Sequence, residues 1–190
     1  MKAVTEIRLS GFVLVLAAVI WIITEIMEII NGVFTPLQLG LTSISFMLIP
    51  YGLLGIHAVQ SSRCRFLSFL GAVIGGLAFI VWSGVCIAEI VIEAQDETLF
   101  PTFTGGKIYY TTASLLTILG LLLLGISIIR ARVFTVWIGY MLVIVLVLSA
   151  VLPLLGLSSV VLNGMAIVLS AIFIILGWSL MAGRYTMHEK

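Results

Sequence analysis

The chain has 190 residues, of which 62% are hydrophobic and only 9% are charged, and its formal net charge at pH 7 is +1. Soluble domains have about a quarter of their residues charged, so this composition excludes an ordinary soluble protein. A mean hydropathy of +1.33 predicts instead a chain that contacts lipid over most of its length. The sequence also lacks the basic cluster that a nucleic-acid-binding surface requires.

Apolar stretches of about 20 residues, the length at which a helix crosses roughly 30 Å of hydrocarbon, follow one another along the chain. Helices are favoured over a barrel, because barrel strands alternate between apolar and polar residues over about ten residues. We therefore predict an all-α, polytopic membrane protein with six transmembrane helices. The expected segments, in chain order, are Leu9–Ile30, Leu39–Val59, Phe66–Ile92, Ile108–Ile129, Val133–Leu155 and Val160–Met181.

Glu25 is the most informative residue of the first segment. Counting from Leu9 at about 1.5 Å per residue places it inside the hydrocarbon. An acidic side chain at the centre of a transmembrane helix costs about 2.5–3.5 kcal/mol, so it usually faces the bundle interior or a wet cavity, or stays protonated. Glu25 is therefore a candidate functional residue.

The first and third segments share a pattern in which a tryptophan precedes a glutamate by the same step. Trp21 precedes Glu28, and Trp82 precedes Glu89, with Glu93 one turn further. If the two helices face each other, these carboxylates converge on an outward-opening pocket suited to protons, a hard cation such as Ca²⁺, or an amine. The tryptophans would then form an aromatic wall for a cationic ligand. The simpler interpretation is that the glutamates mark the water boundary and the tryptophans only pack.

The even-numbered segments share another pattern, Leu-Gly-Ile or Leu-Gly-Trp, followed by His57, Ser127 or Ser179. Together the two patterns predict three tandem helical hairpins in a single transmembrane domain, with repeats at about 8–63, 65–130 and 132–184. The three polar residues would form a small ring at the cytoplasmic mouth. A histidine bonded to backbone or water is the simpler interpretation of His57.

Basic residues set the predicted orientation, because loops rich in Lys and Arg stay in the cytoplasm. They flank the first segment, the turns after the second and fourth, and the end of the sixth, leaving Lys107 alone on the other side. We therefore predict a multi-pass protein of the cell membrane with both termini in the cytoplasm. The residues of the basic side are Lys2, Arg8, Arg63, Arg65, Arg130, Arg132, Arg184 and Lys190.

Gly71 and Gly75, four residues apart in the third segment, predict close approach of a neighbouring helix. The outer connection at 95–107 is the longest, and we expect it to form either a lid over the helix ends or a solvated loop. Cys64 and Cys86 lie at different membrane depths, so no disulfide is expected.

The stretch Leu121–Gly139, LLLLGISIIRARVFTVWIG, contains a basic turn between two apolar segments. It resembles a helix–loop–helix of uncharacterised multi-pass membrane proteins of bacteria and archaea, assigned to domains of unknown function, in which the loop often reads SRxxPRWxG. Thr135 and Val136 stand in place of its Pro-Arg pair. The resemblance implies a prokaryotic inner-membrane protein and names no activity. The positions that match the general shape are Arg130, Arg132, Trp137 and Gly139.

The leading functional hypothesis is a small carrier, channel or ligand-binding protein whose outward pocket uses Glu25 and Glu89. The alternative is a structural or accessory subunit of a membrane complex. A lipid-modifying intramembrane enzyme comes third, because the sequence supplies no catalytic constellation beside a lone carboxylate. No cofactor is expected, and the expected partners are membrane lipids and either a second copy of the chain or another membrane subunit.

Overall fold

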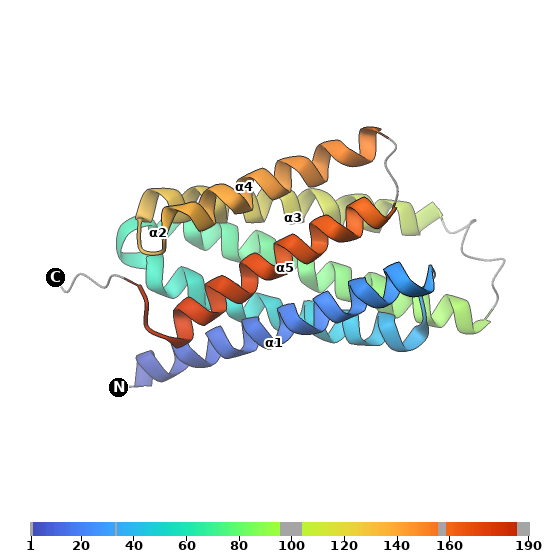
Figure 1. Cartoon of the computed structure of the whole chain (residues 1–190), viewed down its shortest axis with the longest axis horizontal. Coiled ribbons are helices and arrows are strands. Elements are labelled where there is room, and N and C mark those ends of the chain that lie inside the picture. The colour runs from blue at the N-terminus through green and yellow to red at the C-terminus, as the bar shows by residue number, and fades with distance from the viewer. Residues whose placement is uncertain (1, 33, 96–103, 156–158, 186–190) are drawn as a thin grey trace.

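The computed structural model describes residues 2–32, 34–95, 104–155 and 159–185. Within these residues the chain forms helices and no strand, so the fold is all-α (Figure 1). The elements are α1 (Lys2–Asn31), α2 (Pro36–Gln95), α3 (Thr104–Ala131), α4 (Val136–Val151), the short 3₁₀ helix η2 (Leu152–Leu155) and α5 (Ser159–Met181). Most of the outer connection at 95–107, expected as a lid or a solvated loop, lies outside the described residues.

The predicted number of helices is wrong. The described residues form five α-helices, and four of these, α1, α2, α3 and α5, contain apolar spans long enough to cross a membrane. The expected segments Leu39–Val59 and Phe66–Ile92 both belong to α2. The sequence predicts a boundary between them because residues 60–65 are mostly polar, but polar residues do not end a helix in the way that Pro or Gly do. The expected segment Val133–Leu155 gives only the 16-residue α4 followed by η2.

Helix α2 reverses its direction at a single non-helical residue, Cys64, whose φ and ψ are −141° and 52°. Its two arms, residues 36–63 and 65–95, therefore lie side by side (Figure 1). Side chains at roughly equal distances from the reversal meet across the arms. His57 Nδ1 lies 2.8 Å from Ser68 Oγ, and Ser43 Oγ lies 2.8 Å from Ser83 Oγ. These contacts fix the register of the two arms.

Glycines allow the closest helix contacts. A Cβ atom added to Gly11 of α1 would lie 2.6 Å from the Gly177 carbonyl oxygen of α5. The expected small-residue pair of α2 faces α3, where Gly75 meets Gly120 and a Cβ on Gly71 would lie 2.7 Å from the Leu124 nitrogen. Such contacts bring helix backbones together and gain packing energy that larger residues would prevent.

The three glycines of the repeated Leu-Gly pattern all lie at helix contacts. A Cβ on Gly55 would collide with Ser10, one on Gly125 would lie 2.9 Å from Val143, and one on Gly177 would lie 2.7 Å from the Gly11 oxygen. The pattern therefore coincides with tight packing in each case. The division into three hairpin repeats stays a prediction.

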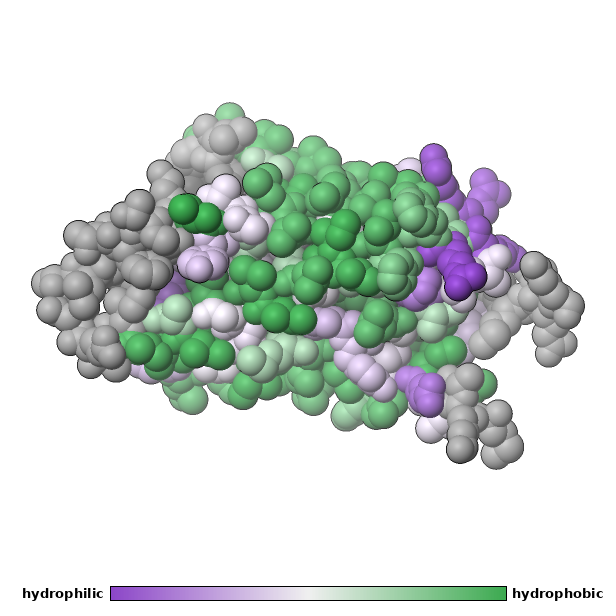
Figure 2. All heavy atoms as spheres, turned by 180° about the vertical axis from the view of Figure 1, so that it is seen from behind, coloured by the Kyte–Doolittle hydropathy of each residue, from purple (hydrophilic) through white to green (hydrophobic). Residues whose placement is uncertain are grey.

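On the face that Figure 2 shows, the bundle is apolar around its middle and hydrophilic at one end. Bulky apolar side chains near the middle of the helices are largely exposed, including Ile80 at 54% and Ile144 at 50%. This is the surface that lipid requires and that water disfavours, so the long apolar helices fit a membrane location. The hydrophilic end is where α1 begins and where α3 and α5 end (Figure 1).

Candidate ligand-binding cavity

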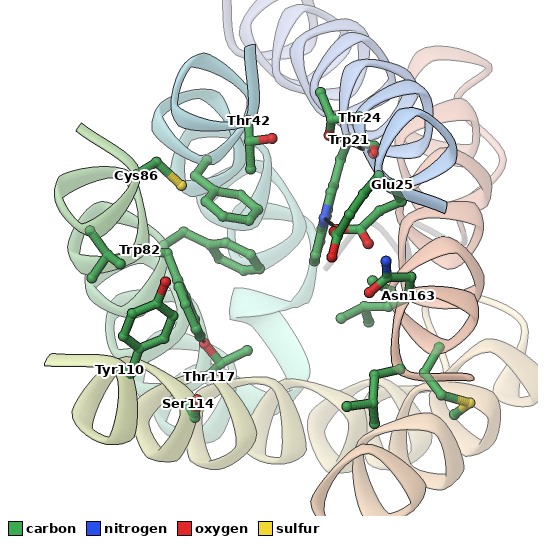
Figure 3. A pocket seen from close by; sticks show the side chains of 18 of the residues that line it. Trp21, Thr24, Glu25, Thr42, Trp82, Cys86, Tyr110, Ser114, Thr117 and Asn163 are labelled. Carbon is green, nitrogen blue, oxygen red and sulfur yellow. Dashed lines mark hydrogen bonds between the residues drawn. The ribbon is translucent and has the colours of Figure 1, made fainter. Parts of the chain in front are cut away.

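A cavity of about 490 Å³ lies between the five α-helices, toward the end of the bundle where α1 and α4 end and α5 begins. Residues of both arms of α2 contribute to its walls. Figure 3 shows the open space, with residues of α1 on one side and residues of the second arm of α2 and of α3 opposite. The cavity is thus at the end of the bundle opposite the hydrophilic end.

The structure brings five of the six sequence-predicted ligand residues to this cavity. Trp21, Glu25 and Glu28 reach it from α1, and Trp82 and Glu89 reach it from the second arm of α2. The side chain of the sixth, Glu93, lies outside the described part of the chain. The facing arrangement of the two Trp/Glu helices exists because α2 reverses at Cys64, which places its second arm across the cavity from α1 (Figure 3). Ligand binding by these residues stays a prediction.

The Glu25 carboxylate is held in place by a neighbour on its own helix. The Trp21 indole nitrogen donates a hydrogen bond of 2.7 Å to Glu25 Oε1 from one turn away (Figure 3). Trp21 is only 6% exposed, and the Thr24 hydroxyl donates to its carbonyl oxygen at 2.9 Å. A buried indole has little rotational freedom, so this bond fixes the carboxylate at the cavity wall.

The charge on the cavity wall has one sign. Its acidic side chains are Glu25, Glu28 and Glu89, and none of the described residues that line it is Lys, Arg or His. Glu25 and Glu28 are one turn apart, so their like charges repel when both are ionised. Asn163 of α5 lies close to Glu28 and supplies a neutral polar group there. The cavity therefore favours a ligand with positive charge.

Aromatic rings form a continuous surface between the two tryptophans. Phe46 lies edge-on to Trp21 with ring centroids 5.0 Å apart, and Phe79 does the same at 5.7 Å. Phe46 also contacts Trp82 at 6.4 Å. Trp82 packs edge-on against Tyr110 of α3 at 5.3 Å, and its indole nitrogen donates to the Thr117 hydroxyl at 3.2 Å (Figure 3). All five aromatic residues line the cavity, so its wall combines carboxylates with aromatic rings.

Several polar residues of the cavity were not singled out in the sequence, and two of these, Gln38 and Asn163, are amides. Gln38 is the more important, because it is 1% exposed and its Oε1 atom has no hydrogen-bond partner. It stands near the start of an apolar segment, where a glutamine is ordinary, so its burial could not be predicted from the sequence. Asn163 carries a weak signal, since it is an amide within the apolar segment Val160–Met181.

The three residues expected at the cytoplasmic mouth hydrogen-bond to different partners. His57 pairs with Ser68, Ser127 donates to Gln60 Oε1 at 2.6 Å, and Ser179 donates to a carbonyl oxygen of its own helix. Their role as a polar ring stays a prediction. Cys64 and Cys86 are both free.

No protein-family model matches the chain, and neither a curated protein nor a solved structure matches it. Among the described residues, no group of three or more His, Cys, Asp or Glu side chains is placed to hold a metal ion. The cavity and its lining are therefore the observations that bear on function.

Proposed function

We propose that this protein is a small membrane carrier or ligand-binding protein whose cavity binds a cation. The position of Glu25 supports this most directly. Its carboxylate lies within an apolar helix, at a cavity wall that carries no basic residue among those described. An ionised carboxylate in this environment is costly unless a positive charge or water compensates it. A bound cation supplies that charge, and the cavity supplies the room.

Three buried aromatic residues favour a carrier or binding protein over an open channel. Trp21, Phe79 and Phe173 contact one another with centroid distances of 5.7–6.4 Å, and each is at most 6% exposed. Along their helices, these residues stand closer than Glu25 does to the hydrophilic end of the bundle. Their close packing supports a cavity that is closed on this side, from which a ligand leaves by the way it entered or after a change in helix packing.

The orientation that we propose places the hydrophilic, arginine-bearing end in the cytoplasm, so that both termini are inside and the cavity faces outward. Cys64, at the reversal of α2, belongs to the inner end and is partly exposed. In a Cys86→Ala background, a membrane-impermeant maleimide should label Cys64 in inside-out vesicles and leave it unlabelled in right-side-out vesicles. The opposite labelling would place the cavity toward the cytoplasm.

Binding is tested by thermal unfolding of the purified protein in detergent with Ca²⁺, Mg²⁺, Mn²⁺, Zn²⁺ and a set of organic amines. A ligand present at a hundred times its Kd stabilises the folded state by about 2.7 kcal/mol. For a chain of this length that corresponds to a rise in Tm of about 5–10 °C. The wild type should show such a rise with at least one cation.

Glu25→Gln keeps the shape and removes the charge, so it should abolish the rise. Glu6→Gln is the matched control, because Glu6 is an exposed glutamate near the other end of the same helix. A rise lost in Glu25→Gln and kept in Glu6→Gln supports the proposal. A flat response to every cation in all three proteins would contradict it and favour the accessory-subunit alternative.

A further inference from the structure

We infer that the ligand is an organic ammonium compound with N–H donors on an apolar body, and that Gln38 is a binding residue that accepts one of its hydrogen bonds. This inference rests on the proposed function, which requires only that some cation binds. It adds the chemical class of the ligand and a residue that recognises it. The observations that carry it are an unpartnered buried acceptor, the acceptor-rich polar wall, and the aromatic surface beside them.

The orientation of the Gln38 amide is fixed by its neighbour. Its Nε2 atom donates to the Thr24 carbonyl oxygen at 2.9 Å, across the contact between α2 and α1. The reverse orientation would bring two oxygen acceptors together, so Oε1 must be the atom that faces away from Thr24. That oxygen has no partner, although the residue lines the cavity and is 99% buried. A buried acceptor without a partner is unfavourable, and a ligand donor would satisfy it.

The polar groups near Gln38 are also acceptors. Gln38 bonds the backbone of Thr24, the residue that precedes Glu25 on α1, and it lines the same cavity as the Glu25 and Glu28 carboxylates. The indole nitrogen of Trp21 bonds only one of the Glu25 oxygens. Several acceptors with negative charge match an ammonium group, which offers a positive charge and two or three N–H donors.

The rest of the cavity fits an apolar body better than a hydrated metal ion. Its volume of about 490 Å³ lies within the range of sites for small organic molecules, roughly 300–1,000 Å³. The wall that faces α1 is formed by Trp82, Phe79 and Tyr110, with Phe46 between the two sides. Aromatic faces attract ammonium groups and also pack against hydrocarbon or another ring.

The ligand class is tested on the wild-type protein with four probes at one pH. They are 2-phenylethylamine, its N,N,N-trimethyl derivative, the neutral 2-phenylethanol, and calcium chloride. The primary amine should bind at least about tenfold more tightly than the alcohol, because only the amine carries the charge. It should also bind about fivefold more tightly than the trimethyl compound, which keeps the charge and has no N–H to donate to Gln38.

The role of Gln38 is tested with Gln38→Met, which keeps the volume and removes the acceptor. The variant should weaken binding of the primary amine by about fivefold to tenfold and leave the trimethyl compound within twofold of the wild type. Gln60→Met is the matched control, because Gln60 is also a buried glutamine with an unpartnered side-chain atom, and it lies near the far end of the same arm. It should leave both affinities unchanged.

The outcomes separate this inference from the proposed function. Equal binding of 2-phenylethylamine and 2-phenylethanol would overturn the inference that the ligand is an ammonium compound. A Glu25-dependent response to calcium alone would overturn it too. In both cases the cavity would still be a binding site. Equal binding of the primary and trimethyl compounds to the wild type would overturn the assignment of Gln38, and this holds even if Gln38→Met does not fold. A flat response to all probes and to the wider cation panel would overturn both.

Discussion

Gly120 of α3 lies directly against the backbone of α2, and a Gly120→Ala substitution tests whether this contact organises the cavity. The added Cβ would collide with the Gly75 nitrogen and would lie 2.6 Å from the Gly75 Cα and 2.9 Å from the Ile74 carbonyl carbon. All three atoms belong to the backbone and cannot rotate away. The helices must therefore separate to accommodate a single methyl group.

The expected loss of stability follows from two opposing terms. Overpacking of a tight contact costs about 3 kcal/mol at the upper end of its range, which applies here because the opposing atoms are backbone. Alanine regains about 1 kcal/mol in helix propensity relative to glycine. The net destabilisation is about 2 kcal/mol, which corresponds to a fall in Tm of about 4–8 °C for a chain of this length. Separation of the helices should also weaken the Trp82–Thr117 hydrogen bond one turn away, and ligand affinity with it.

The assay is thermal unfolding in detergent, with Gly84→Ala and Gly164→Ala as controls. Both controls are glycines inside helices, and a Cβ at either position meets nothing within 4 Å. They should leave the Tm unchanged or raise it slightly, because only the propensity term operates. If Gly120→Ala is as stable as these two variants, the close contact between α2 and α3 does not exist as described.

Two further predictions concern the interior of the bundle. Ser127→Ala should destabilise the protein by about 1–3 kcal/mol, because it leaves the Gln60 oxygen buried without its 2.6 Å partner. The double variant Ser127→Ala/Gln60→Leu should recover most of that loss, and additive losses in thermal unfolding would contradict this. In the folded protein a bulky maleimide should label Cys64 and spare Cys86, which is 5% exposed. Equal labelling of the two before unfolding, measured by mass spectrometry, would show that the reagent reaches Cys86 through the cavity that it lines.

The candidate site was predictable in part because an acidic side chain within a membrane-spanning helix costs free energy. Glu25 stood out as an acidic residue inside an apolar run, and the matched Trp-to-Glu steps pointed to helices of similar depth. The structure places both sets of side chains on one cavity. Gln38 gave no such signal, because a glutamine near the end of an apolar segment is normally hydrated. Its burial depends on the approach of α1, where the Thr24 carbonyl oxygen accepts from it.

The number of helices predicted from the sequence was wrong for a physical reason. The hydropathy of a segment indicates whether its side chains favour lipid. It does not indicate where the backbone leaves helical geometry. Residues 60–65 interrupt the apolar pattern, yet only Cys64 leaves helical geometry, so two expected segments form the two arms of α2. The composition and the apolar periods by themselves determined the all-α class and the fit to a membrane. Only the tertiary structure decided which helices touch, because close contact depends on glycines such as Gly75 and Gly120 meeting across helices far apart in the sequence.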